Sequence, residues 1–286
     1  MAELQKITTG PNLVFDAWVD GKADAPLVLL LHGFSESFHM WRSQLPALAA
    51  AGYRAVAPSQ RGYSPGARPA TSDHANYSFD RLLADAMDVV AVCGYGDRRF
   101  HLVGHDWGAS IAWGIADRTP ERIASLTILS RPHPSAFNRA LLTTDAEQAK
   151  RSSHHTGFLD PGAGPRIIAD NSRWLRERLA RNKVPAAAIE EHVSVLGNEA
   201  AIEAALTWYR ARGAIRDNLG VINVPVLYLW GDVDDTVGRM AAEGTRDFVS
   251  GSYQFEALPG VGHFAADQVP ERVSELLLAH LARHPI

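Results

Sequence analysis

Short apolar runs alternate with longer helical patterns along most of the chain. The runs are rich in Val, Leu and Ile and lie at residues 26–31, 53–58, 99–104, 123–129 and 225–230. Because both faces of each run are apolar, each is expected to be a strand that is covered on both sides. Such strands, separated by helices, are typical of a mostly parallel sheet with helices on both faces. The pattern therefore predicts the α/β fold class.

The alternation stops between the fourth and the fifth run. Residues 131–218 read as helices only, with Asn171 or Ser172 as the expected N-cap of the segment NSRWLRERLA. A helical insertion in an α/β chain is expected to form a cap over the C-terminal edge of the sheet, where such folds bind ligands. A plain linker of this length would be unusual. We therefore divide the chain into a first core part (1–130), a helical cap (131–218) and a second core part (219–286).

Composition and charge exclude several classes of protein. With 286 residues, 46% of them hydrophobic, the chain can bury a full core. The net charge of -4 and the lack of a dense Lys and Arg block make nucleic acid an unexpected partner. The N-terminus has no apolar leader and the longest apolar run is too short to span a bilayer, so we expect a cytoplasmic protein without membrane contact. Cys93 is the only cysteine and is expected in the core, which excludes an internal disulfide and a thiolate metal cluster. No cofactor or metal is expected.

The segment HLVGHDWGAS, residues 101–110, has the layout of a nucleophile elbow. A strand-like run meets a Gly-x-Asp-x-Gly pattern, and a helical run follows. Glycines on both sides let one side chain stand on a tight turn between strand and helix. The motif usually carries serine at its centre, whereas this chain carries Asp106.

The rest of a catalytic triad follows in the order nucleophile, acid, base. Asp234 comes just after the fifth apolar run, with Asp232 and Asp235 as close competitors. His263 lies in LPGVGHF, before a last helix that is expected to begin near Pro270. The joint occurrence of these residues in this order predicts a triad of Asp106, Asp234 and His263.

An aspartate nucleophile restricts the chemistry. A serine that attacked a saturated carbon would form an ether, which this machinery could not hydrolyse. An aspartate forms an alkyl ester, and water activated by a histidine can attack the ester carbonyl. The backbone amides of Phe34 and Trp107 are the expected oxyanion-hole donors, while His32 and His105 are expected to be structural. Asp106 therefore points to an epoxide or a carbon–halogen bond.

On these residues the chain resembles the α/β-hydrolase-fold epoxide hydrolases and their relatives, the haloalkane and haloacetate dehalogenases. The motifs that carry the resemblance are HGFSESFHMWRSQLPALAAAGYRAVAPSQRGY, GHDWGASIAW, RPHP, ALTWYR, WGDVDDTV and GVGHF. The spacing in this family, three residues after Gly231, selects Asp234 as the acid. One departure is Ser35, where the family commonly has a proline in a cis turn.

The resemblance also implies donors in the cap that protonate the opened epoxide. Epoxide hydrolases typically use two cap tyrosines, and Tyr209 matches one of them. His154 takes the place of the other, with His155 as the neighbouring candidate. Some epoxide hydrolases likewise pair a histidine with a tyrosine.

The dehalogenase alternatives differ in the residues after the nucleophile. Haloacetate dehalogenases usually carry arginines there, whereas this chain has Trp107 and Ser110, which disfavours a carboxylate substrate. Haloalkane dehalogenases bind halide with indole N–H groups, for which Trp107 and Trp174 are candidates. We therefore predict an epoxide hydrolase that acts on a small molecule. A dehalogenase is the alternative, and a non-catalytic binding protein is a third, which the triad disfavours.

Overall fold

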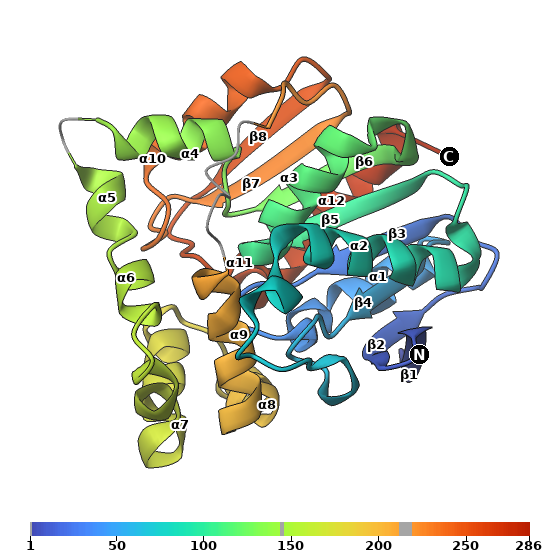
Figure 1. The fold of residues 1–286 in the computed structure, drawn as a ribbon. Helices are drawn as coiled ribbons and strands as arrows, with labels where there is room; N and C mark the ends of the chain where they lie inside the picture. The colour runs from blue at the N-terminus through green and yellow to red at the C-terminus, as the bar shows by residue number, and fades with distance from the viewer. Residues whose placement is uncertain (1, 144–145, 212–218) are drawn as a thin grey trace.

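The computed structural model describes residues 2–143, 146–211 and 219–286, without the side chain of His154. Within these residues, eight strands form one sheet. The strands are β1 (Glu3–Gly10), β2 (Leu13–Asp20), β3 (Leu27–Leu31), β4 (Arg54–Pro58), β5 (Phe100–His105), β6 (Ile123–Leu129), β7 (Val226–Gly231) and β8 (Tyr253–Leu258). They lie in the order β1-β2-β4-β3-β5-β6-β7-β8 (Figure 1).

The sheet is mostly parallel. The pairs β1–β2 and β2–β4 are antiparallel, and all the other neighbours are parallel. Strands β3 to β7 correspond to the five predicted runs, which confirms the α/β class. The sequence pattern missed β1, β2 and β8, whose residues are largely exposed or half-buried. The edge strands β1 and β8, and β2 next to β1, lack the continuous apolar run that identifies a strand covered on both sides.

Helices cover both faces of the sheet. The helices that belong to these two layers are α1 (Gln44–Ala50), α2 (Phe79–Val90), α3 (Trp107–Arg118), α10 (Arg239–Gly244), α11 (Ala265–Gln268) and α12 (Pro270–Arg283). The side chains of β3 contribute to two hydrophobic cores, one on each face of the sheet. Leu27, Leu29 and Leu31 pack with α2 and α3, while Val28 and Leu30 pack with α1 and α12. Alternate side chains of a strand point to opposite faces, so one apolar run supplies both cores.

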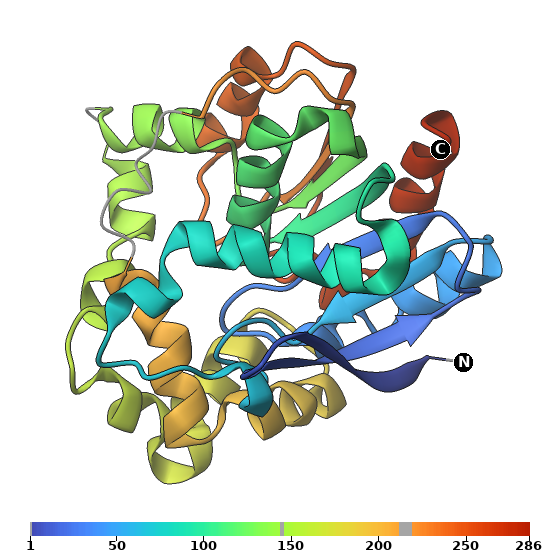
Figure 2. The ribbon, with the colours of Figure 1, turned by 45° about the vertical axis from the view of Figure 1, so that its right-hand side comes forward.

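Between β6 and β7 the described residues form helices joined by loops, with an isolated bridge at Ile222 just before β7. The helices are α4 (Pro134–Leu141), α5 (Glu147–Arg151), α6 (His154–Phe158), α7 (Ala163–Arg181), α8 (Ala186–Leu196) and α9 (Glu199–Arg210). In both views α5 to α9 gather on the side of the sheet away from the two chain ends (Figures 1 and 2). The proposed cap boundary at residue 218 lies outside the described residues.

Helix α7 differs from its prediction. The sequence predicted a helix start at Asn171 or Ser172, but the helix begins at Ala163. It is interrupted at residues 169–172, where Asp170, Asn171 and Ser172 have positive φ angles. The predicted N-cap therefore falls at the interruption, and the helical residues before it were not predicted.

Two smaller expectations can be compared with the structure. Cys93 is a free, half-buried thiol that packs against the edge of the core, and burial raises its pKa. It is therefore less buried than the sequence pattern suggested. Among the described helices, none combines the length and the apolar character that a bilayer crossing requires.

Candidate active site

Asp106 stands on a sharp turn between β5 and α3. Its backbone has φ 49° and ψ -112°, a region that non-glycine residues rarely occupy. The flanking glycines allow this turn to pack closely. A Cβ on Gly104 would collide with the backbone of Gly108 and Ala109, and a Cβ on Gly108 would collide with the backbone of β3. The motif thus fits its local structure, and the strained turn exposes the carboxylate at the C-terminal edge of the sheet.

The carboxylate of Asp106 is held between two groups. Its Oδ1 accepts a hydrogen bond of 3.0 Å from the backbone N–H of Phe34. Its Oδ2 lies 3.8 Å from Nε2 of His263, which is longer than a hydrogen bond. The Phe34–Ser35 peptide is cis, although Ser35 replaces the proline that is common in the family. The structure thus brings Asp106 together with one of the two predicted amide donors. The other, Trp107, begins α3.

His263 and Asp234 meet on the other side of the imidazole. Nδ1 of His263 lies 3.1 Å from Oδ2 and 3.2 Å from Oδ1 of Asp234. Asp234 also accepts hydrogen bonds from the backbone N–H groups of Thr236 and Val237. These contacts identify Nδ1 as the donor to Asp234, which leaves the lone pair of Nε2 facing Asp106.

The competing acids point elsewhere. Asp232 accepts a hydrogen bond from the backbone N–H of Gly260. Asp235 is exposed and accepts one from the side chain of Asn182. Of the three carboxylates, the geometry therefore brings Asp234 to the imidazole.

Charge and hydrogen bonding set the protonation states of Asp106, Asp234 and His263. Burial alone would raise the pKa of Asp106, but the charges of His263 and Arg131 and the amide of Phe34 outweigh it and lower the pKa. Burial opposes ionisation of Asp234 as well, yet His263 and the hydrogen bonds keep its pKa well below the usual range. Burial would lower the pKa of His263, but the two carboxylates raise it. Both carboxylates are therefore ionised at neutral pH.

Two hydroxyl groups beside Asp234 and His263 were missed by sequence reasoning. Ser130 Oγ donates to Asp234 Oδ2 at 2.7 Å, and Thr236 Oγ1 donates to Oδ1 at the same distance. Both hydroxyls also lie within 2.8 Å of Nδ1 of His263. Ser130 follows β6, at the position where some dehalogenases carry their acid. Ser130 stands directly after the fourth apolar run, but no local pattern in the sequence linked it to Asp234, which lies in the loop after β7.

A cap helix also holds the loop that carries the acid. The buried side chain of Gln148, on α5, donates to the carbonyl of Thr236 at 2.8 Å and accepts from the N–H of Gly238 at 2.9 Å. Arg151, one turn later, donates to the carbonyl of Asp234. Residues of the insertion therefore contact the backbone beside the predicted acid.

The two structural histidines are neutral and hydrogen-bonded. The N–H of Gln60 donates to Nε2 of His32 at 3.1 Å, and burial lowers the pKa of His32 to about 3. Nε2 of His105 lies 3.0 Å from the carbonyl of His263, and burial lowers the pKa of His105 to about 4. Both rings support the backbone around the site, as expected from the sequence.

The cap contributes an aromatic wall opposite Asp106. Tyr209, on α9, is buried and lines the cavity at Asp106 together with His155. Ring centroids lie 5.5 Å apart for Tyr209 and His155, and 5.1 Å apart for Tyr209 and Trp107. The side chain of His154 lies outside the described residues. Trp174 packs on Phe34, with a centroid distance of 6.4 Å.

Two arginines that the sequence did not single out line the same cavity. Arg131 follows β6 and is 8% exposed, and Arg178 lies on α7. Asp106, His263 and Tyr209 belong to the same lining. The cavity therefore combines a carboxylate, a base and a tyrosine with two cations.

A second buried group of ionisable residues joins the cap to the core. Nδ1 of His192, on α8, accepts from the N–H of Ser37, so Nε2 carries the proton and donates to Asp267 at 2.8 Å. Asp267 also pairs with Arg42. Burial and Asp267 raise the pKa of Glu36 well above its usual value. The side chains of Glu36, His192 and Asp267 are close enough to be metal ligands. The protonated Nε2 offers no lone pair to a metal, so these residues form a hydrogen-bonded network that connects α8 to the core.

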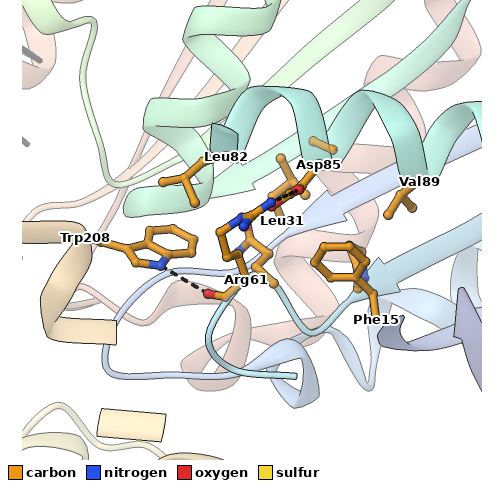
Figure 3. A pocket seen from close by; sticks show the side chains of 10 residues that line it. Phe15, Leu31, Arg61, Leu82, Asp85, Val89 and Trp208 are labelled. Atoms are coloured by element: carbon orange, nitrogen blue, oxygen red, sulfur yellow. Dashed lines mark hydrogen bonds and ion pairs between the residues drawn. The ribbon is translucent and has the colours of Figure 1, made fainter. Parts of the chain in front are cut away.

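A separate cavity lies beside α2, with Trp208 of α9 at one end of it (Figure 3). The two charged residues of its lining bind each other: Arg61 makes hydrogen bonds of 2.5 and 2.6 Å to Asp85. The indole N–H of Trp208 donates to the carbonyl of Arg61 at 3.1 Å. The rest of the lining is mostly apolar, so this cavity is a weaker candidate than the one at Asp106.

Comparisons with known proteins identify the fold family of the chain. Residues 26–269 match the model of the alpha/beta hydrolase fold family. The AB hydrolase superfamily protein YfhM of Bacillus subtilis is 30% identical, over 91% of this chain and 92% of its own length. Epoxide hydrolase 4 of Mus musculus is 31% identical, over 91% of this chain and 74% of its own. A solved structure described as a novel epoxide hydrolase from metagenomes of hot environments has a TM-score of 0.85 at 27% identity, covering 99% of this chain and 100% of that one.

Proposed function

The chain belongs to the α/β-hydrolase fold family, in the group that includes the epoxide hydrolases, and we propose that it hydrolyses an epoxide to a vicinal diol. The observation that carries the proposal is an aspartate, Asp106, on the nucleophile elbow of a cavity that Tyr209 and His155 also line. Epoxide opening requires two groups: a carboxylate nucleophile that forms the ester, and a donor that protonates the epoxide oxygen. The substrate is a small molecule.

In the first step Asp106 attacks an epoxide carbon. Its lowered pKa keeps the carboxylate ionised, and the N–H of Phe34 orients Oδ1. Oδ2 is the oxygen that faces His263, and we assign it the attack. A new carbon–oxygen bond forms while the epoxide carbon–oxygen bond breaks, which leaves an alkoxide on the substrate.

The alkoxide takes a proton from the cap. Tyr209 is one donor because a tyrosine hydroxyl ordinarily carries its proton at neutral pH. A histidine of α6 is the second. Both His154 and His155 are candidates, and His155 is supported by its position in the cavity lining beside Tyr209.

In the second step water hydrolyses the ester. His263 removes a proton from the water through Nε2, and Asp234 stabilises the imidazolium through Nδ1. The carbonyl under attack belongs to Asp106, so the negative charge develops where the N–H of Phe34 already donates. The N–H of Trp107 is the proposed second donor. When the tetrahedral intermediate collapses, the bond between the Asp106 carbonyl carbon and the substrate oxygen breaks, and the imidazolium of His263 gives its proton to the departing diol oxygen. The proton released when Asp106 returns to its carboxylate form replaces the one that the cap donor gave to the alkoxide. Esterification removes the charge of Asp106, one of the causes of the raised pKa of His263, which favours the neutral base.

The test is a panel of epoxides and haloalkanes with the purified protein and with Asp106→Ala. We expect diol from at least one epoxide, no halide release, and no diol with the variant. Halide release without diol would replace this proposal with dehalogenation, for which Trp107 is the candidate halide ligand. If neither diol nor halide is formed, and the wild type and Asp106→Ala bind a panel compound equally tightly, the result would favour a binding protein.

A further inference from the structure

We propose that the substrate of this site is an epoxide that carries a carboxylate, which Arg131 and Arg178 bind. The proposal rests on the epoxide hydrolysis proposed above and specifies its substrate class. It starts from the walls of the cavity at Asp106, where one arginine follows β6 and the other lies on α7.

Arg131 is fixed by packing. Its guanidinium lies over the ring of Phe137, with 3.9 Å between Cζ and the ring centroid. Its backbone carbonyl accepts a hydrogen bond of 3.1 Å from the indole of Trp113. A guanidinium stacked on a ring is held in one plane, and a planar donor suits a planar acceptor. Arg131 therefore presents a preorganised cation to the cavity.

Arg178 approaches from the cap. Its side chain is 11% exposed and its Cζ lies 5.9 Å from the ring centroid of Trp174. Its nearest acid, Asp235, lies 3.7 Å away and is 49% exposed, so the ion pair is weak. Among the described residues, Nε of Arg178 is buried without a hydrogen-bond partner. A buried donor of this kind is costly unless a ligand satisfies it.

A carboxylate on the substrate accounts for both cations. Opening a neutral epoxide requires a nucleophile, a base and a hydroxyl donor. Arg131 helps to keep that nucleophile ionised, but none of the three groups has to be a guanidinium. An anionic substrate must approach the ionised Asp106, and two cations on the walls offset the repulsion. Guanidinium groups bind carboxylates in paired, charge-assisted hydrogen bonds.

The sequence disfavoured a carboxylate because Trp107 and Ser110 occupy the positions where arginines were expected after the nucleophile. The structure supplies arginines from two other segments. The reaction itself is unchanged: Asp106 opens the epoxide, water cleaves the ester, and the substrate carboxylate is carried through intact. The product is a dihydroxycarboxylate.

The test compares 3-phenylglycidate with 3-phenylglycidamide, which have nearly the same shape and differ in charge. For the wild type we expect kcat/KM for the carboxylate to exceed that for the amide by about tenfold or more. Arg178→Met and Arg131→Met should each reduce this ratio severalfold. Arg173→Met is the matched control, because Arg173 lies on the same helix and its side chain is 66% exposed. That variant should retain the wild-type ratio.

Equal or better turnover of the amide by the wild type would overturn the carboxylate proposal and leave epoxide hydrolysis standing. If neither compound is hydrolysed, calorimetric titration of the wild type with 3-phenylpropionate and 3-phenylpropanamide decides. Binding of the carboxylate that is at least tenfold tighter, and that weakens in Arg178→Met, would support the anion site even without hydrolysis. Equal affinities would overturn it.

Discussion

The core side and the cap side of the cavity are built from different interactions. The core side, formed by Phe34, Asp106, Asp234 and His263, is held by hydrogen bonds to backbone groups and buried hydroxyls. The cap side, formed by His155, Phe158, Arg178 and Tyr209, is held largely by contacts between rings and by packing. Directional bonds fix atoms to within a narrow range, whereas ring packing tolerates substitution. We infer that the core side fixes the formation and hydrolysis of the ester, whereas the cap side, which supplies the proton donors and Arg178, determines which electrophile is opened.

The largest effect is expected at the base. His263→Gln should lower turnover by about 10²- to 10⁴-fold, because glutamine cannot accept a proton from water. The attack by Asp106 does not need the base, so the ester should accumulate. Intact-protein mass spectrometry should then show an adduct with the mass of the substrate. His74→Gln, at an exposed position, is the control. Normal turnover by His263→Gln without an adduct would remove His263 from this role.

A smaller loss is expected at the acid. Asp234→Asn keeps the shape of the side chain but weakens the stabilisation of the imidazolium, and we expect turnover to fall on the order of 10²- to 10³-fold. Asp235→Asn changes the adjacent, exposed carboxylate and should alter turnover little. Steady-state kinetics of the two variants distinguish the positions. The reverse result would identify Asp235 as the acid.

On the cap side, Tyr209→Phe should slow formation of the ester. The loss of one donor to a developing alkoxide costs about 2.7 to 4 kcal/mol, or roughly 10²- to 10³-fold in rate. The measurement is pre-steady-state alkylation with an aryl epoxide. His154→Ala and His155→Ala, measured in parallel, should differ, and the larger decrease identifies the second donor. Unchanged alkylation in all three variants would reject the cap donors and favour a dehalogenase.

The smallest predicted effect concerns the coupling between nucleophile and base. The charge of Asp106 is one cause of the raised pKa of His263, so Asp106→Asn should lower that pKa. Histidine NMR titration of the wild type and the variant measures the change. By the same reasoning, hydrolysis of the ester should slow as pH falls through the pKa of His263 in the alkylated enzyme, because a protonated imidazole cannot act as a base. An unchanged pKa in Asp106→Asn would show that the two groups are not coupled.

The two sides also differ in how far the sequence predicted them. Asp106, Asp234 and His263 each follow a recognisable strand or motif, so their order along the chain was enough to predict that they meet in one site. Ser130, Gln148 and the two arginines have no such local signal, because their positions depend on how distant segments pack. The buried parallel strands were predicted for a similar reason, and the half-exposed strands β1, β2 and β8 were not.

The cap histidine illustrates the same limit. A tyrosine motif located Tyr209, but adjacent histidines on a short helix cannot be ranked from the sequence alone. Side-chain direction on α6 depends on its packing against α7 and α9. His155 lies beside Tyr209 in the structure, and this distinction could not be read from the pattern of residues 154–158.

The covalent role of Asp106 is tested most directly by a single turnover in oxygen-18 water with enzyme in excess over epoxide. Water should attack the carbonyl of the Asp106 ester, so mass spectrometry of the peptide that contains Asp106 should show one oxygen-18 in its carboxylate. The diol from that first turnover should lack the label, because its new oxygen comes from Asp106. Label in the diol with an unlabelled Asp106 would mean that water attacks the substrate directly, and would contradict the account.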